Sequence, residues 1–152
     1  VALVNGRVPS PPRRPNVAVE CSMSLTAPSA YMHDFATGTD YCVETTITTP
    51  VILFETRKAG VGGDSITDRA LSVRVDPSIT AGTTVPLTGQ PADLVQLQYE
   101  EGTIERRCWW FTGSATVVAQ RPNLDVTFDA TCVNPASAAN GFALKGEFTS
   151  TL

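Results

Sequence analysis

His33, the one histidine of the chain, stands next to the carboxylate of Asp34. A histidine that is oriented by a carboxylate can act as general base toward a serine or cysteine nucleophile. The sequence has no G-x-S-x-G motif that would supply such a nucleophile. Neighbouring residues on a short loop also seldom point at each other. We therefore expect His33 to be a loop histidine without a catalytic task.

A group of acidic residues, Glu100, Glu101 and Glu105, flanks a predicted turn. Two carboxylates at a suitable separation can hydrolyse a glycosidic bond. Nothing in the sequence fixes such a separation, and solvated carboxylates are common at turns. A secreted hydrolase is therefore kept as an alternative, and the main expectation is a protein that is not an enzyme and has no catalytic residues.

Residues 60–68, GVGGDSITD, form an oxygen-rich stretch with Asp64 and Asp68 as its only charged residues. An EF-hand calcium loop needs acidic residues at alternating positions and a terminal glutamate. A phosphate-binding loop needs a lysine followed by serine or threonine, which is missing here. We expect a flexible hairpin connection, and we expect no metal and no cofactor.

Trp109 and Trp110 are neighbours in a run of alternating apolar residues. Because consecutive side chains of a strand face opposite ways, Trp109 is predicted to join Phe111 in the core and Trp110 to point outward. An exposed tryptophan can stack on a sugar or anchor a protein partner. Trp110 is therefore the candidate binding residue. The alternative is that it lies under a loop or beside Cys42 and Cys108.

The four cysteines, Cys21, Cys42, Cys108 and Cys132, are isolated from one another and form no C-x-x-C pair. A zinc site normally shows close cysteine pairs, and one histidine cannot complete such a site. Isolated cysteines in even number on strand-like segments indicate two disulfides instead. Because disulfides persist outside the reducing cytosol, the chain is expected to be extracytoplasmic: secreted, periplasmic or at a cell surface.

The sequence leaves the pairing of these cysteines open. Sequence proximity favours the pairs 21–42 and 108–132, each of which closes a loop worth roughly 3 kcal/mol in the chain-entropy model. The predicted pleat places Cys21 and Cys132 with the inward residues, and Cys42 and Cys108 on the opposite faces. A nested pairing, 21–132 and 42–108, would respect that pleat.

The elements that must position these residues are short strands. In residues 107–152, apolar or small residues recur at every second position in three runs, and two turn signals separate the runs. A period of two means one buried and one solvated face, so this part is predicted to be an antiparallel three-stranded meander.

Further strands are predicted in the rest of the chain, and residues 26–40 are predicted to contain one helical turn over a sheet end. In residues 41–48 the inward set is predicted to be Tyr41, Val43, Thr45 and Ile47. Short strands with turn residues between them are typical of all-β folds. The predicted fold is an antiparallel β-sandwich of eight or nine strands with two disulfides. The strands are expected at residues 17–25, 41–48, 51–57, 70–75, 83–87, 93–100 and in the final meander.

Residues 1–16 are predicted to precede a single domain that spans residues 17–152. Residues 1–8 are mildly strand-like, with Val1, Leu3, Val4 and Val8, and residues 9–15 form a proline-rich spacer that should be extended. One hypothesis is a linker to a membrane or lipid anchor. The other is an arm that adds a strand to the open sheet edge of a neighbouring copy.

Length and composition exclude several classes of protein. A chain of 152 residues fits one domain with a substantial core. With 42% hydrophobic and 17% charged residues it is typical of a globular protein and too apolar for a disordered one. The net charge is −4 and the basic residues are scattered, so no nucleic-acid partner is expected. No apolar run approaches the roughly 18 residues of a membrane span.

Five segments from residue 71 onward share an order of features: LSVRVDPSITAGTTVPL, LVQLQYEEG, CWWFTGSATVV, LDVTFDATC and FALKGEFTS. This order resembles that of secreted bacterial lipoprotein-type β-sandwich domains of unknown function. The chain departs from them by its cysteines and by the absence of the usual glycine within residues 125–128. The resemblance implies the fold and an extracytoplasmic location, with envelope attachment through the proline-rich stretch, and it carries over no functional residue.

The main functional expectation is a non-catalytic extracytoplasmic or cell-surface module with a binding or structural role. Its partner would be a surface protein, a glycan or another copy of itself. The alternative is a self-assembling, pilus- or filament-like subunit that uses residues 1–8 as a donor strand. An open sheet edge that accepts the arm would distinguish the two.

Overall fold

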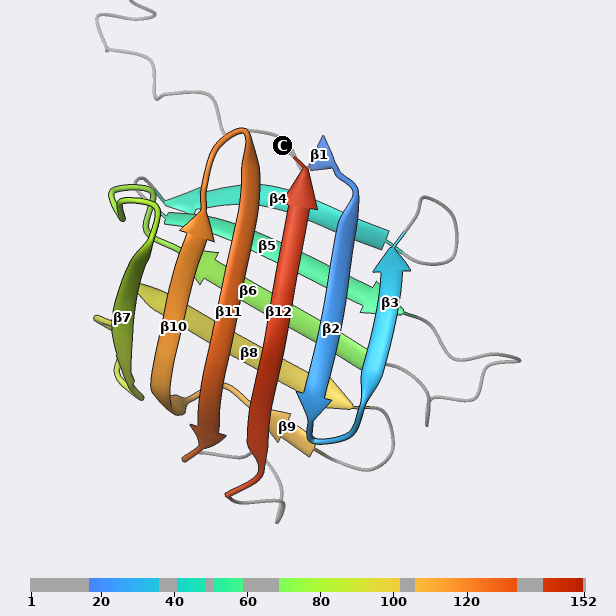
Figure 1. Cartoon of the computed structure of the whole chain (residues 1–152), viewed down its shortest axis with the longest axis vertical. Helices are drawn as coiled ribbons and strands as arrows, with labels where there is room; N and C mark the ends of the chain where they lie inside the picture. The colour runs from blue at the N-terminus through green and yellow to red at the C-terminus, as the bar shows by residue number, and fades with distance from the viewer. Residues whose placement is uncertain are drawn as a thin grey trace, which may run out of the picture.

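The computed structural model describes residues 17–35, 41–48, 51–58, 69–101, 106–133 and 141–151. These residues form two antiparallel sheets that pack face to face, and the strands of one sheet run across those of the other (Figure 1). The predicted all-β sandwich is therefore confirmed. The proposed arm residues Val1, Leu3, Val4 and Val8, and the loop of residues 60–68, lie outside the described residues.

Each sheet has six strands in the described part of the chain. The first sheet contains, in spatial order, β1 (Val17–Ala18), β4 (Tyr41–Thr48), β5 (Val51–Lys58), β6 (Arg69–Val75), β8 (Val95–Glu101) and β9 (Arg106–Cys108). The second sheet contains β3 (Tyr31–Phe35), β2 (Cys21–Ala27), β12 (Ala143–Thr151), β11 (Asn123–Cys132), β10 (Phe111–Ala119) and β7 (Thr83–Thr88).

The predicted meander is confirmed as β10, β11 and β12, which are neighbours in the second sheet. Twelve strands are described where eight or nine were expected. Compared with nine, the three additional strands are β1, β3 and β9. β1 has two residues and β9 has three, so neither is long enough to show a period of two, and β3 lies where a helical turn was predicted.

Alternate residues of the strands fill the space between the sheets. Alternation predicts that Leu71, Val73 and Val75 of β6 and Val95, Leu97 and Tyr99 of β8 face inward, and all six are buried. The alternating apolar residues of β11 are buried as well, whereas on β12 Leu144 and Phe148 are buried and Gly146 is half-buried. Burying a large apolar side chain contributes about 1.5–3 kcal/mol, so these layers supply most of the driving force for folding. The largest side chains that are fully buried include Tyr99, Phe54, Phe148, Met23 and Leu71.

Residues Tyr31–Phe35 form the edge strand β3 and not the predicted helical turn. Phe35 is buried and Tyr31 and His33 are half-buried, whereas Met32 and Asp34 are exposed. The ring of His33 lies 4.6 Å from that of Phe35 and 6.2 Å from that of Tyr31. The ring-bearing side chains of Tyr31, His33 and Phe35 stand at every second position, and this period of two is typical of a strand and not of a helical turn.

The predicted inward set of β4 is wrong. Cys42 and Glu44 are buried, whereas Val43 and Thr45 on the opposite face are only half-buried. Two tertiary contacts fix this orientation: Cys42 forms a disulfide, and the Glu44 carboxylate lies 3.2 Å from Nη2 of Arg121, which follows β10 in the other sheet. A buried carboxylate with a cationic partner is tolerated in a core, and hydrophobic alternation does not reveal that partner.

Both disulfides join one sheet to the other. Cys21 of β2 is bonded to Cys42 of β4, and Cys108 of β9 is bonded to Cys132 of β11. These are the pairs that sequence proximity favours, and the nested alternative is wrong. It relied on a pleat that turned Cys42 and Cys108 outward, but all four cysteines point into the core.

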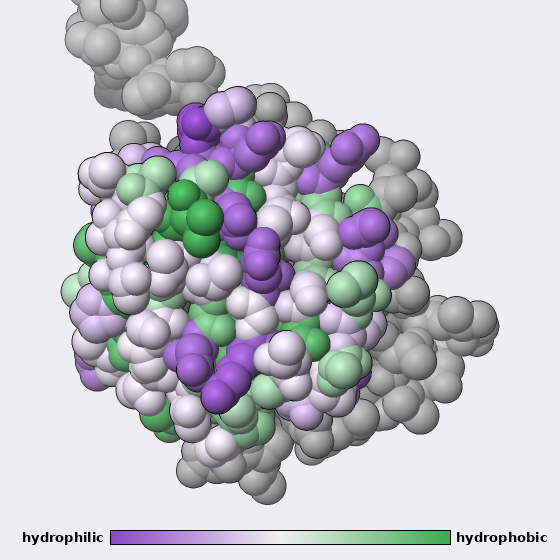
Figure 2. Space-filling view, in the orientation of Figure 1, coloured by the Kyte–Doolittle hydropathy of each residue, from purple (hydrophilic) through white to green (hydrophobic). Residues whose placement is uncertain are grey.

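The outward face of the second sheet is polar. Its exposed and half-buried positions on β10, β11 and β12 are mostly threonine, serine and charged residues. In the space-filling view this face is pale to purple over much of its area (Figure 2). The second sheet therefore has one face in the core and one face toward solvent.

Candidate functional site

The histidine–carboxylate pair does not form a catalytic unit. His33 and Asp34 occupy consecutive positions of β3, so their side chains lie on opposite faces of the second sheet. His33 lies between aromatic rings, whereas Asp34 is exposed and opposes Ser22 of β2. This arrangement leaves the carboxylate in no position to orient the imidazole.

Glu100 and Glu101 of the acidic group also point to opposite faces, and Glu105 lies outside the described residues. Glu100 forms an ion pair with Arg107, with 3.2 Å between Oε2 and Nη2. Glu101 is buried and lies 3.7 Å from Nη2 of Arg69. The two carboxylates therefore do not face a common cleft.

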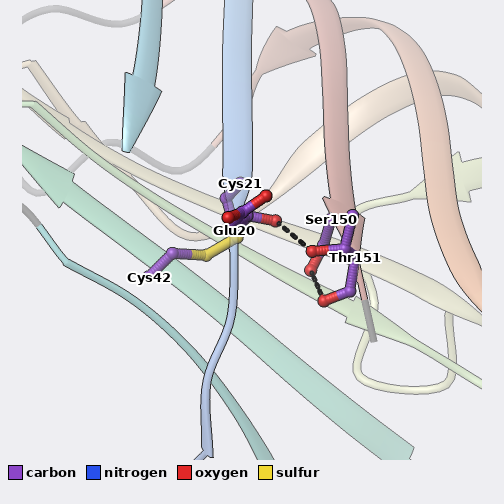
Figure 3. The surroundings of a disulfide bond; sticks show 5 residues. All are labelled: Glu20, Cys21, Cys42, Ser150 and Thr151. Atoms are coloured by element: carbon purple, nitrogen blue, oxygen red, sulfur yellow. Dashed lines mark hydrogen bonds between the residues drawn. A yellow bond between two sulfur atoms is a disulfide. The ribbon is translucent and has the colours of Figure 1, made fainter. Parts of the chain in front are cut away.

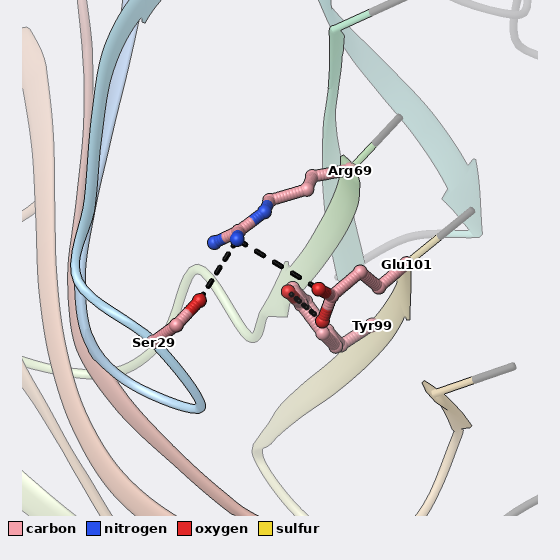
Figure 4. Close-up of polar contacts among 4 residues, drawn as sticks. All are labelled: Ser29, Arg69, Tyr99 and Glu101. Carbon is pink, nitrogen blue, oxygen red and sulfur yellow. Dashed lines mark hydrogen bonds and ion pairs between the residues drawn. The ribbon is translucent and has the colours of Figure 1, made fainter. Parts of the chain in front are cut away.

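Glu101 belongs to a polar cluster that bridges the two sheets (Figure 4). The Tyr99 hydroxyl donates to Glu101 Oε2 at 3.1 Å, and Arg69 Nη2 donates to Ser29 Oγ at 2.8 Å. The Arg69 guanidinium also lies 4.3 Å from the centre of the Tyr31 ring. Because Ser29 follows β2 and Arg69 begins β6, this cluster fixes the β2–β3 turn against the first sheet.

No group of three or more metal-ligating side chains is placed to hold a metal ion within the part of the chain that the structure describes. The oxygen-rich residues 60–68 lie outside that part.

The two tryptophans lie where the chain passes from one sheet to the other. β9 ends at Cys108 and β10 begins at Phe111, so strand alternation does not continue through Trp109 and Trp110. The prediction that Trp109 joins the core is therefore wrong: its side chain is 42% exposed, and Trp110 is half-buried. The backbone carbonyl of Trp110 accepts a hydrogen bond from the amide of Val133 at 2.9 Å, which holds the connection against the end of β11.

The tryptophans border a groove on the outward side of the first sheet, which we call the tryptophan groove. Its volume is about 190 Å³. β9 pairs with β8 only at Tyr99, Glu100 and Glu101. Among the described residues, the two tryptophans, and not a further strand, lie beside the rest of this edge of β8. The groove is lined by Ser72, Arg74, Gln96, Leu97, Gln98, Trp109 and Trp110.

The polar side chains of the tryptophan groove are held in place by hydrogen bonds. Arg74 and Gln96 are opposite each other on β6 and β8, and Arg74 Nη1 donates to Gln96 Oε1 at 3.1 Å. Gln96 Nε2 donates in turn to the carbonyl of Pro91 at 2.6 Å. Arg74 Nε is buried and has no hydrogen-bond partner among the described residues. The guanidinium is thus fixed in position and keeps an unused donor.

The loop that offers the Pro91 carbonyl is itself fixed by Asp93. The carboxylate of Asp93 accepts hydrogen bonds from the backbone amides of Thr88, Gly89 and Gln90 at 2.9, 3.0 and 3.4 Å, and from the Thr88 hydroxyl. Burial alone would raise the pKa of Asp93, but these hydrogen bonds outweigh it and hold the pKa below its usual value. The β7–β8 connection is therefore a rigid support for the groove.

A larger cavity, which we call the disulfide-end cavity, lies beside the Cys21–Cys42 bond and has a volume of about 850 Å³. Near the disulfide, the Thr151 hydroxyl donates to the Glu20 carbonyl at 3.3 Å (Figure 3). The Thr151 amide donates to the same carbonyl at 2.9 Å. The cavity is lined by Val19, Glu20, Cys21, Ser22, Asp34, Phe35, Ala119, Asn123, Leu124, Asp125, Thr149, Ser150 and Thr151.

One carboxylate of this cavity, Asp125, is close to a second carboxylate outside it. A hydrogen bond between Asp125 and Glu147, together with burial and the charge of Asp125, raises the pKa of Glu147 above its usual value. Oδ1 of Asp125 is buried and has no hydrogen-bond partner among the described residues. Asp125 is therefore one of the carboxylates that line this cavity.

Sequence reasoning pointed to Trp110 but missed Arg74, Gln96 and the disulfide-end cavity. Arg74 and Gln96 are 22 residues apart and become neighbours only through the pairing of β6 with β8. The available signal was weak: both are polar residues at outward positions of alternating strands. The cavity joins the starts of β2 and β11 to the ends of β3 and β12, which no local pattern connects.

No helix in the described residues is long and apolar enough to cross a membrane. We compared the chain with protein-family models, with curated proteins and with solved structures, and none of the three comparisons found a match.

Proposed function

We propose that this chain is a non-catalytic extracytoplasmic module that binds a glycan in the tryptophan groove. The observation that carries the proposal is the exposed indole of Trp109 beside the fixed guanidinium of Arg74. An indole offers an apolar face to the C–H groups of a sugar ring. The guanidinium and the amides of Gln96 and Gln98 offer hydrogen-bond partners for hydroxyl and carboxylate groups.

The size and charge of the groove narrow the ligand class. The groove volume of about 190 Å³ is smaller than the roughly 300–1,000 Å³ that is typical of small-molecule pockets. A shallow groove of this size suits a sugar that stacks on the surface and is not enclosed. The positively charged guanidinium of Arg74 lines the groove, so a sugar with a carboxylate would gain an electrostatic interaction that a neutral sugar lacks. We therefore expect uronic-acid-containing glycans to bind more tightly than neutral ones.

Two further observations support an extracytoplasmic setting for this function. The chain forms two disulfides, which are typical of oxidising compartments. The resemblance of residues 71–152 to secreted lipoprotein-type domains points to the same location.

The test is binding to an array of immobilised neutral and uronic-acid-containing oligosaccharides. Trp109→Ala should weaken binding at least tenfold, because it removes the exposed stacking surface, and Arg74→Gln should remove the preference for acidic sugars. Met32→Ala is the matched control, since Met32 is 79% exposed on the second sheet. Failure of the wild-type chain to bind any glycan, or equal binding by Trp109→Ala, would contradict the proposal.

A further inference from the structure

We propose that the disulfide-end cavity binds the arginine-bearing residues 1–16 of a second copy of this chain. The proposal goes beyond glycan binding and uses none of the residues of the tryptophan groove. It assigns a receiving site on the sandwich to the N-terminal segment.

The cavity has the size and surface of a binding site. Its volume of about 850 Å³ lies within the range of roughly 300–1,000 Å³ that is typical of ligand pockets. Val19, Phe35 and Leu124 supply apolar surface, and serine, threonine and asparagine side chains supply polar groups. Such a mixed surface suits a chain segment that carries both apolar and charged side chains.

The charges of the cavity and the segment are opposite. The lining contains the carboxylates of Glu20, Asp34 and Asp125, and it contains no lysine or arginine among the described residues. Residues 1–16, VALVNGRVPSPPRRPN, contain three arginines and no acidic residue. Asp125 lines the cavity, and an arginine of the segment could form an ion pair with one of these three carboxylates.

The path of the chain favours a second copy over the chain's own segment. β1 is antiparallel to β4, with Val17 opposite Glu44 and Ala18 opposite Val43, and the Val19 amide donates to the Cys42 carbonyl at 3.1 Å. Going backward from Val19 to Val17, the chain therefore runs along β4 from Cys42 toward Glu44. A segment with four prolines favours an extended conformation, which suits contact with a second copy more than a return to the same domain.

The segment is long enough to reach a neighbour. Sixteen residues in an extended, proline-rich conformation span up to about 50 Å. A contact between the segment of one copy and the cavity of the next is heterologous, because different surfaces meet. Repetition of such a contact produces rings or filaments.

Two charge variants of the full chain test this contact. In the first, which we call the arm variant, Arg13→Glu/Arg14→Glu makes residues 1–16 net negative, so they should be repelled by the acidic cavity of another copy. In the second, which we call the cavity variant, Glu20→Lys/Asp34→Lys makes the cavity more basic, so it should repel the basic residues 1–16 of another copy. Both replaced carboxylates are exposed, so the fold should tolerate the change. Sedimentation velocity on the oxidised protein measures the outcome.

We expect the wild-type chain to form species larger than the 16.2 kDa monomer as its concentration rises. Each variant alone should sediment as a monomer. An equimolar mixture of the two should assemble again, because each segment then meets a cavity of opposite charge. Only a contact between different molecules produces this complementation.

The control variant Arg107→Glu/Lys145→Glu makes the same change in net charge as the arm variant at two exposed positions outside the cavity, and it should assemble like the wild type. Near-ultraviolet circular dichroism verifies that each variant is folded. A wild-type chain that stays monomeric, folded variants that assemble as well as the wild type, or a mixture of folded variants that stays monomeric would each overturn the proposal.

Discussion

At the scale of single residues, the most informative pair is Asp125 and Glu147 on the outward face of the second sheet. They lie on the neighbouring strands β11 and β12, and the hydrogen bond to Asp125, with burial and the charge of Asp125, makes Glu147 harder to ionise. The raised pKa of Glu147 means that the folded state binds a proton more tightly than the unfolded state does. The contribution of Glu147 to stability is therefore full below the unfolded pKa, near 4.5, and is lost as the pH rises through the folded value.

Glu147→Gln should remove this dependence on pH. The glutamine keeps a hydrogen-bonding group beside Asp125 but carries no charge, so the variant should gain about 0.5 kcal/mol over the wild type at neutral pH, where solvent screens the repulsion. Urea unfolding between pH 4 and pH 8, run on both proteins, measures the difference. A constant difference across that range would show that the two carboxylates do not interact in solution.

The residue scale also explains why the tryptophan groove is preorganised. Arg74 is held by Gln96, Gln96 by the Pro91 carbonyl, and the loop around Pro91 by Asp93. Each contact fixes the next, so a ligand would meet side chains that have already lost their rotamer freedom. Preorganisation of this kind lowers the entropic cost of binding.

At the scale of elements, glycines set how closely the central strands of the second sheet approach each other. Gly113 of β10 has φ +134°, and a Cβ atom there would overlap the Asp129 carbonyl oxygen of β11. A Cβ at Gly146 of β12 would overlap the Ser24 carbonyl oxygen of β2. In both places the obstacle is backbone of a neighbouring strand, which cannot move aside without breaking the pairing.

Gly113→Ala should therefore lower the free energy of unfolding by about 3 kcal/mol, a value reached when the backbone itself is strained. Gly82→Ala is the matched control: Gly82 has φ +87°, but no neighbouring atom lies within 4 Å of the point that a Cβ would occupy. The control should lose only about 1 kcal/mol, from the unfavourable dihedral angle. Chemical denaturation measures both variants. If they lost the same free energy of unfolding, the close approach to Asp129 would not contribute to the cost of Gly113→Ala.

The short strand β9 is the element that creates the candidate binding site. Because it ends at Cys108, the following tryptophans leave the strand pattern and cover the open edge of β8. A longer β9 would pair with that edge and would place one tryptophan in the core, as strand alternation predicts.

At the scale of the whole molecule, the two disulfides join the sheets at separate places: one involves β4 and the other β9, and these strands lie near opposite edges of the first sheet (Figure 1). The sequence separations of 21 and 24 residues correspond to roughly 3 kcal/mol for each bond in the chain-entropy model. Single domains have total stabilities of about 5–15 kcal/mol, so the two bonds together are a large share of the whole.

The double variants Cys21→Ser/Cys42→Ser and Cys108→Ser/Cys132→Ser should each lose about 3 kcal/mol of unfolding free energy. Since the bonds are far apart, the losses should add when all four cysteines are replaced. Urea unfolding of the three variants and the wild type measures these differences, and a reducing agent should affect only proteins that retain a disulfide. An unchanged midpoint after reduction of the wild type would refute a stabilising role.

The proposed binding regions use different parts of the molecule. The tryptophan groove lies on the first sheet at β6 and β8, whereas the disulfide-end cavity draws mainly on β2, β11 and β12 of the second. Assembly through the cavity would therefore leave the groove open, and an assembled chain would present many grooves at once. Repeated weak binding sites strengthen attachment to a surface through their high effective concentration.

The sequence by itself determined the all-β class, the C-terminal meander and the presence of disulfides. These follow from local information: a period of two along β10, β11 and β12, turn residues between the strands, and four isolated cysteines. Burial of one face needs only that alternation, so the inward residues of β6 and β8 could also be predicted.

Only the tertiary structure decided the orientation of β4 and the position of both proposed binding regions. Glu44 is buried because Arg121 reaches it from the other sheet, and Arg74 meets Gln96 because β6 pairs with β8. Trp109 is exposed because the alternation breaks between β9 and β10, so that Cys108 and Phe111, three residues apart, are both buried. In each case the deciding contact joins residues that are far apart in the chain or depends on where a strand ends, and local periodicity contains neither.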